Sequence, residues 1–215
     1  MSARVKLVIF GLSLSSSWGS GHATVWRGLL RAMAARGHQI LFYERDQPFY
    51  ALRRDLPHPP YARLVLYRDW DSVAEEARSE LADADVVIVT SYCPEAIIDL
   101  LAQRRLPLRV FYDLDAPVTL ARLQQNLPVE YIGPRGLCDY DLVLSFTGGG
   151  ALQALQNRLG ATNVAVLYGS VDPELRHRHR QRLVGRPGSI FPAGQGDPCR
   201  LDHGGSDGRR AAEPR

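Results

Sequence analysis

The sequence predicts an α/β fold, a Rossmann-like parallel sheet with helices on both faces. Apolar segments rich in Val, Ile and Leu alternate along the chain with amphipathic helical segments. The apolar segments are continuous rather than alternating, which is typical of parallel strands that are buried on both sides. The chain has 215 residues, 45% of them hydrophobic, so it is long enough to bury one such core.

Seven apolar segments are predicted to be strands, and helices are predicted between most of them. The strands cover residues 6–12, 40–43, 64–67, 85–90, 108–112, 141–146 and 164–168. The helices cover residues 24–36, 71–82 and 95–104, and one leads from Gly148 to Leu159. In such sheets, ligand sites form where the carboxyl ends of the strands meet their loops.

The alternating pattern predicts one domain over residues 1–175 and a disordered tail over residues 176–215. The tail is dominated by Arg, Gly and Pro and has too few large apolar residues to form a core. The whole chain has a single lysine, Lys6, and otherwise uses arginine. A GC-rich gene that is read out of frame gives such a composition, so a frameshifted end is the alternative interpretation of the tail.

Charge and composition exclude several classes of protein. The net charge is +3, but the positive excess lies in the tail, which argues against a nucleic-acid-binding domain. No apolar run is long enough to span a membrane, and the first one is followed by serines rather than a cleavage site, so we expect a cytoplasmic protein. Cys93, Cys138 and Cys199 are too widely spaced to indicate a disulfide framework or a metal site.

Four polar or glycine-bearing segments follow the ends of predicted strands and are expected to converge at one edge of the sheet. The first segment leads into a helix, where glycines and backbone N–H groups suit an anion or sugar hydroxyls. We expect substrate contacts from all four segments. The candidate residues are Trp18, Gly19, Gly21, Glu44, Asp115, Thr147, Gly148 and Gly149.

His22 is the candidate general base. Either Asp113 or Asp115 could orient the His22 ring, and Asp113 is also assigned to catalysis. A structural alternative remains for each of these residues. His22 could bind without transferring a proton, and Asp115 could be the N-cap of a helix that contains Pro117. Trp18 could stack on a sugar or pack on its own loop.

A dinucleotide site is disfavoured because the third glycine of G-x-G-x-x-G is replaced by Thr24. The acidic residue that would contact a ribose is nevertheless present, as Glu44. No P-loop motif occurs in the sequence, and no Gly-x-Ser-x-Gly nucleophile motif occurs within residues 1–175, where the predicted strands lie.

Together these residues resemble the CgeB-like (spore-maturation-type) glycosyltransferases of bacteria. The resemblance covers about residues 4–175 and depends on the order and spacing of its blocks. The first blocks are residues 11–24, 27–29, 37–38 and 42–46, followed by Pro48 and Tyr50. The later blocks are residues 111–120, 140–149 and 167–173.

The resemblance implies the N-terminal half of a GT-B fold, in which two Rossmann-like domains face each other across a cleft. The first domain of such enzymes usually supplies the acceptor side, and the second holds most of the nucleotide-sugar. Helix dipoles and backbone donors stabilise the leaving diphosphate, so no metal and no cofactor beyond the nucleotide-sugar co-substrate is expected. By similarity, Gly19, Gly21 and His22 map to the first loop, and Asp113 and Asp115 to the acidic loop.

The chain departs from the family after Leu175, where a second domain would begin and the Arg/Gly/Pro tail is found instead. We therefore expect this polypeptide alone to transfer little or no sugar from a nucleotide donor to its unknown acceptor. Two alternatives stay open: a non-catalytic domain that binds carbohydrate or a partner, and an NAD-dependent enzyme.

Overall fold

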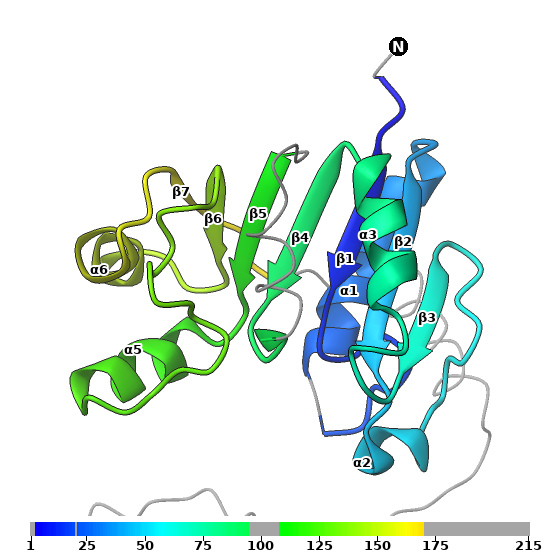
Figure 1. The fold of residues 1–215 in the computed structure, drawn as a ribbon, viewed down its shortest axis with the longest axis horizontal. Coiled ribbons are helices and arrows are strands. Elements are labelled where there is room, and N and C mark those ends of the chain that lie inside the picture. The colour runs from blue at the N-terminus through cyan, green and yellow to red at the C-terminus, as the bar shows by residue number, and fades with distance from the viewer. Residues whose placement is uncertain (1–2, 20, 95–107, 170–215) are drawn as a thin grey trace, which may run out of the picture. The chain divides into compact units, whose positions relative to one another are not determined.

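The computed structural model describes residues 3–19, 21–94 and 108–169. Within them, seven strands form one sheet in the order β3-β2-β1-β4-β5-β6-β7, and all neighbouring strands are parallel (Figure 1). The strands are β1 (Lys6–Phe10), β2 (Gln39–Arg45), β3 (Arg63–Tyr67), β4 (Val86–Thr90), β5 (Leu108–Asp113), β6 (Leu142–Ser145) and β7 (Val164–Val166). The predicted parallel α/β sheet is confirmed. The helix expected over residues 95–104 and the tail from residue 176 lie outside the described residues.

The described helices are α1 (Gly21–Ala35), α2 (Pro48–Ala51), α3 (Ala74–Ala82), α5 (Ala116–Gln124) and α6 (Gly150–Leu159). Helix α3 begins later than residue 71, the predicted start. The reason is a local turn in which Asp69 Oδ1 accepts the Ser72 N–H and the Ser72 hydroxyl donates to the Asp69 carbonyl. Such side-chain bonds compete with the helix. Helix α5 begins directly after Asp115 and has Pro117 in its first turn. Asp115 is therefore at the N-cap position, which is one of the two interpretations of this residue.

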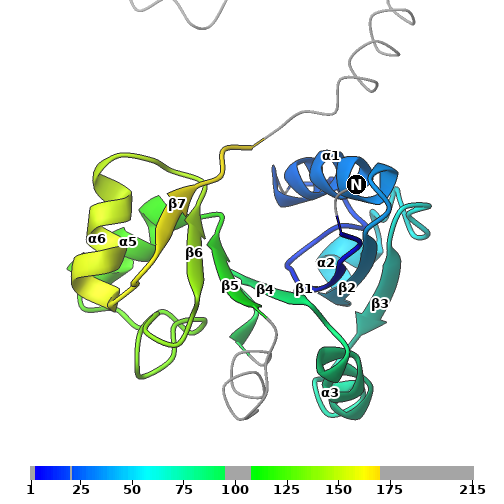
Figure 2. The same cartoon turned by 90° about the horizontal axis from the view of Figure 1, so that it is seen from above.

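The helices cover both faces of the sheet, as predicted, and each face has its own apolar core (Figure 2). Helix α1 buries Trp26 and Leu30 against Ile9 and Phe42 on one face. On the other face, α3, α5 and α6 pack over a larger cluster that contains Phe111. Each fully buried large side chain contributes about 1.5–3 kcal/mol. No described helix is long and apolar enough to cross a bilayer.

The strand order changes direction between β1 and β4. From β1 the chain proceeds outward through β2 to β3, whereas from β4 it proceeds the other way through β5 and β6 to β7. In doubly wound sheets, the crevice outside the carboxyl ends of two such strands is the usual ligand site. The loop after β1 and the residues after β4 therefore border the expected site.

Candidate functional site

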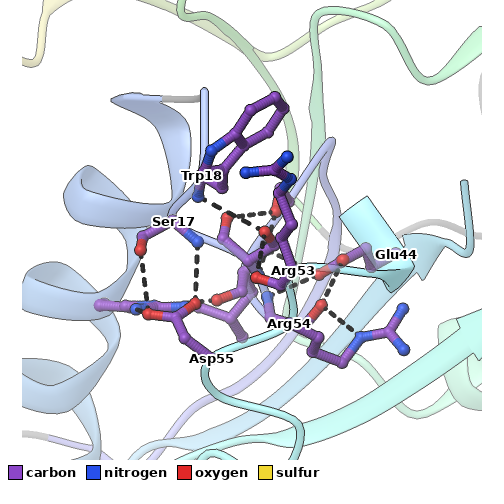
Figure 3. A network of polar contacts seen from close by, with 11 residues as sticks. Ser17, Trp18, Glu44, Arg53, Arg54 and Asp55 are labelled. Carbon is purple, nitrogen blue, oxygen red and sulfur yellow. Dashed lines mark hydrogen bonds and ion pairs between the residues drawn. The ribbon is translucent and has the colours of Figure 1, made fainter. Parts of the chain in front are cut away.

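Residues 13–18, here called the serine loop, lie in the connection from β1 to α1 and are held by a network of polar contacts that includes Glu44 (Figure 3). Glu44 Oε2 accepts the backbone N–H groups of Leu14, at 2.7 Å, and Ser15, at 2.8 Å. Its Oε1 accepts the Ser15 hydroxyl at 2.6 Å. The Glu44 carboxylate is fully buried and bonded to its own loop, and its predicted substrate contact stays a prediction.

A second carboxylate holds the outer side of the serine loop. Asp55 accepts both the backbone N–H and the hydroxyl of Ser17, each at 2.9 Å, and also pairs with two nitrogens of Arg27 at 2.7 and 2.8 Å. The hydrogen bond from Arg27 holds the pKa of Asp55 well below its ordinary range. The Leu56 N–H donates to the Ser15 carbonyl at 2.9 Å, which ties the same two segments together through the backbone.

These contacts correct one expectation about the loop. The backbone N–H groups of Leu14, Ser15 and Ser17 point to carboxylates of the chain itself, so they are not directed at an external anion. The glycine part of the segment behaves differently. Gly19, at φ +66°, and Gly21 both line an open cavity. The serines thus fix the loop, and the glycines border the site.

This cavity, here called the His22 cavity, has a volume of about 470 Å³ and lies at the carboxyl edge of the sheet. Residues that follow four different strands meet in it. It is lined by Leu12, Gly19, Gly21, His22, Gln47, Tyr50, Tyr92 and Asp115. Of the four predicted segments, those after β1 and β5 meet in this cavity, whereas β2 contributes Gln47 and Tyr50 rather than residues 44–46.

His22 and Asp115 form the central pair of the cavity. The His22 Nε2 atom lies 3.1 Å from Asp115 Oδ2. The His22 side chain is 11% exposed and that of Asp115 is 34% exposed, so the carboxylate is the more accessible partner. Asp115 is at the N-cap position of α5, but its side chain makes no capping bond and contacts His22 instead. Of the two carboxylates expected to orient the ring, Asp115 is the one within hydrogen-bond distance.

Asp113 lies beneath this pair and lines neither this cavity nor the neighbouring one described below. It is fully buried, and its Oδ1 accepts the Ser91 hydroxyl at 2.8 Å and the backbone N–H of Asp115 at 3.1 Å. Burial raises the pKa of Asp113, while the hydrogen bond from Ser91 opposes the rise. Asp113 thus supports the turn that carries Asp115. Across the described residues, no three His, Cys, Asp or Glu side chains are grouped as a metal site requires.

Tyr92 is a site residue that sequence reasoning missed. It follows β4 with φ +70°, and its ring centroid lies 6.1 Å from that of His22. Burial, followed by the charge and a hydrogen bond of Asp115, raises the pKa of Tyr92. The signal was present in the sequence, because β4 ends at the same edge of the sheet as β1 and β5. Gln47 and Tyr50 were likewise missed as lining residues after β2.

The remaining predicted contacts lie outside the His22 cavity. Trp18 is 40% exposed and packs on Phe49, with a ring distance of 4.5 Å, while the Arg53 guanidinium lies 3.8 Å from its ring centre. The sugar contact of Trp18 stays a prediction. Three further candidates follow β6 at the same edge without lining the cavity: Thr147, Gly148 and Gly149. Gly149, at φ +64°, is the N-cap of α6.

No family model matches the chain, and no curated protein matches it either. Among solved structures, a sucrose-phosphate synthase from Thermosynechococcus elongatus is similar at 13% sequence identity and a TM-score of 0.46. The match covers 83% of this chain and 96% of that one. At this identity and score, the likeness says nothing of what this chain binds or does.

Proposed function

We propose that the chain is the acceptor-side domain of a nucleotide-sugar-dependent glycosyltransferase with GT-B architecture, of the CgeB-like type that its sequence resembles. The observation that carries the proposal is the His22–Asp115 pair in a cavity at the carboxyl edge of a parallel sheet. The cavity borders the point where the strand order reverses, which is where doubly wound sheets bind their ligands. We place this activity in the cytoplasm.

In the proposed reaction, the pair accepts the proton of an acceptor hydroxyl. The hydroxyl oxygen forms a bond to the anomeric carbon of the donor sugar, and the nucleoside diphosphate leaves with the electrons of the bond that breaks. Because His22 Nε2 and Asp115 Oδ2 lie at hydrogen-bond distance, the proposal assigns proton acceptance to the two residues together. A positioned base of this kind contributes about 10²–10⁴-fold to a rate.

The other predicted residues have supporting roles in this proposal. Asp113 positions Asp115 through the backbone N–H that it accepts. Gly19 and Gly21 allow a ligand close to the backbone beside His22. Thr147, Gly148 and Gly149 at the start of α6 face the donor diphosphate, where a helix N-terminus stabilises negative charge. The nucleotide-sugar is a co-substrate, and the proposal requires no other cofactor.

Calorimetry with a panel of acceptor glycans, nucleotide-sugars and NAD tests the proposal. We expect a glycan to bind, and the variants His22→Gln and Asp115→Asn to bind it at least about tenfold more weakly, as expected for a lost hydrogen bond to a charged group. His58→Gln is the matched control, since His58 is exposed and lines neither cavity. If NAD binds and none of the glycans does, the proposal is contradicted and a dehydrogenase is favoured.

Turnover distinguishes the proposed enzyme from a non-catalytic binding domain. Release of nucleoside diphosphate that requires both nucleotide-sugar and glycan, however slow, is expected to disappear in His22→Gln. If the same release persists in that variant, the assigned proton acceptor is wrong.

A further inference from the structure

A second cavity of about 390 Å³ adjoins the His22 cavity, and the two share Gln47 and Tyr92 as lining residues. It is here called the arginine cavity, because Arg45 and Arg122 both line it. Arg45 is the last residue of β2, and Arg122 lies in the last turn of α5. The two cationic side chains therefore reach one cavity from β2 and from the helix that follows β5, two strands that β1 and β4 separate in the sheet.

The charge of this lining favours an anion. Its titratable groups are the two guanidinium groups, the Glu130 carboxylate and the hydroxyls of two tyrosines, so positive charge prevails. Arg122 Nε donates to the Pro128 carbonyl at 3.0 Å, which fixes the plane of its guanidinium. Among the described residues, no carboxylate lies within ion-pair distance of Arg122. A guanidinium held in this way is suited to two parallel hydrogen bonds to a phosphate or carboxylate.

The wall between the two cavities is aromatic. The rings of Tyr92 and Tyr131 meet edge to face with centroids 5.1 Å apart, and Tyr131 is buried. Burial raises the pKa of both hydroxyls. The Tyr92 hydroxyl is hydrogen-bonded to Asp115 and that of Tyr131 to Thr119, so it is the Tyr92 ring that faces a ligand extending from one cavity into the other.

We propose that the arginine cavity binds an anionic group, a phosphate or carboxylate, of the same acceptor whose hydroxyl lies at the His22–Asp115 pair. This inference rests on the proposed function, because that function assigns the neighbouring cavity to the acceptor. The acceptor is then an anionic sugar rather than a neutral one. Its ring lies along Tyr92, its reacting hydroxyl faces Asp115, and its anionic group faces Arg45 and Arg122.

The diphosphate of a nucleotide-sugar donor is the other possible source of such an anion. The observations favour the acceptor, because the residues proposed to face the donor diphosphate, Thr147 to Gly149, line neither cavity. The experiment therefore compares glucose, glucose 6-phosphate, inorganic phosphate and UDP as probes in calorimetry, in a phosphate-free buffer.

We expect glucose 6-phosphate to bind about tenfold or more tightly than glucose, the range of a charge-assisted hydrogen bond. Arg122→Gln is expected to abolish this preference, and added salt to weaken it. Glu130→Gln is expected to tighten binding about two- to threefold, because a like charge is removed from the lining. Arg158→Gln, on an exposed residue of α6, is the control that leaves binding unchanged. Inorganic phosphate should compete with glucose 6-phosphate.

Opposite shifts in Arg122→Gln and Glu130→Gln separate the proposal from simple misfolding, because a damaged fold cannot tighten binding. The proposal is overturned if glucose 6-phosphate binds no better than glucose, or if its preference survives in Arg122→Gln. UDP binding that depends on Arg122 in the same way would also overturn it, by assigning the anion to the donor. In His22→Gln the phosphate preference should persist, so failure of the proton acceptor and failure of the anion site give different results.

Discussion

Replacing Glu44 by glutamine is expected to destabilise the fold by about 2 kcal/mol, because this buried carboxylate accepts three hydrogen bonds from the serine loop. The amide oxygen can still accept the two backbone N–H groups, but without the charge each bond weakens by about 1 kcal/mol. The amide nitrogen then faces the Ser15 hydroxyl, which already accepts Arg54 Nε at 2.8 Å. The lower desolvation of a neutral amide offsets part of the remaining loss.

Urea unfolding monitored by far-ultraviolet circular dichroism measures this change. For a domain of this size, 2 kcal/mol lowers the urea midpoint by about 1 M with an unchanged slope. Glu75→Gln is the matched control, because Glu75 is exposed in the first turn of α3. If the two variants unfold within about 0.5 kcal/mol of each other, the hydrogen bonds of Glu44 do not hold the loop as argued.

Two further substitutions separate the roles of the other carboxylates. Asp55→Asn is expected to cost about 1 kcal/mol at pH 7, the screened value for a half-exposed ion pair. The pKa of Asp55 is lowered in the folded state, so its stabilisation is fully present above the ordinary value of 3.8 and is lost progressively as the pH falls from there through the lowered pKa. The gap between the urea midpoints of wild type and variant should therefore be smaller at pH 3 than at pH 7, and an equal gap at the two pH values would refute this. Asp113→Asn is expected to leave stability at pH 7 unchanged or raised, within about 1 kcal/mol, because asparagine keeps the Oδ1 acceptor and removes a buried charge. The pKa of Asp113 is raised on folding, so the stability of the wild type decreases as the pH rises through the raised pKa, and the variant lacks this decrease. A loss of 2 kcal/mol or more at pH 7 in the same urea series would show that the charged form is required.

The sequence predicts the sheet well because strands that are buried on both sides must be apolar throughout. In β4 and β5, Val87, Val89 and Phe111 are buried on one face of the sheet. Ile88 and Tyr112 are buried on the other face, so neither face tolerates a polar residue there. Helix boundaries are less predictable, since the start of α3 depends on the side-chain bonds between Asp69 and Ser72 rather than on periodicity. The short helix α2 has too few residues to produce a periodic signal.

Within the site, the sequence predicts which loops meet but not which carboxylate faces the cavity. Asp113 and Asp115 have the same side chain and lie at and just beyond the end of the same strand. Asp113 is bonded to Ser91 in the interior, whereas Asp115 is bonded to His22. The role of Glu44 is equally hard to predict, because a carboxylate near the end of a strand can bind a ligand or accept hydrogen bonds from a loop of its own chain. The deciding contacts are formed by Leu14 and Ser15, which lie far from Glu44 in the sequence.

The bond between the Leu56 N–H and the Ser15 carbonyl makes one amide proton a reporter for the site. Leu56 lies in the connection from β2 to β3, whereas Ser15 belongs to the loop that leads to His22. Opening of the serine loop must break this bond, so hydrogen exchange at Leu56 measures how often the loop leaves its closed position. A ligand that binds beside Gly19 and Gly21 in that position should slow exchange at Leu56 without touching it.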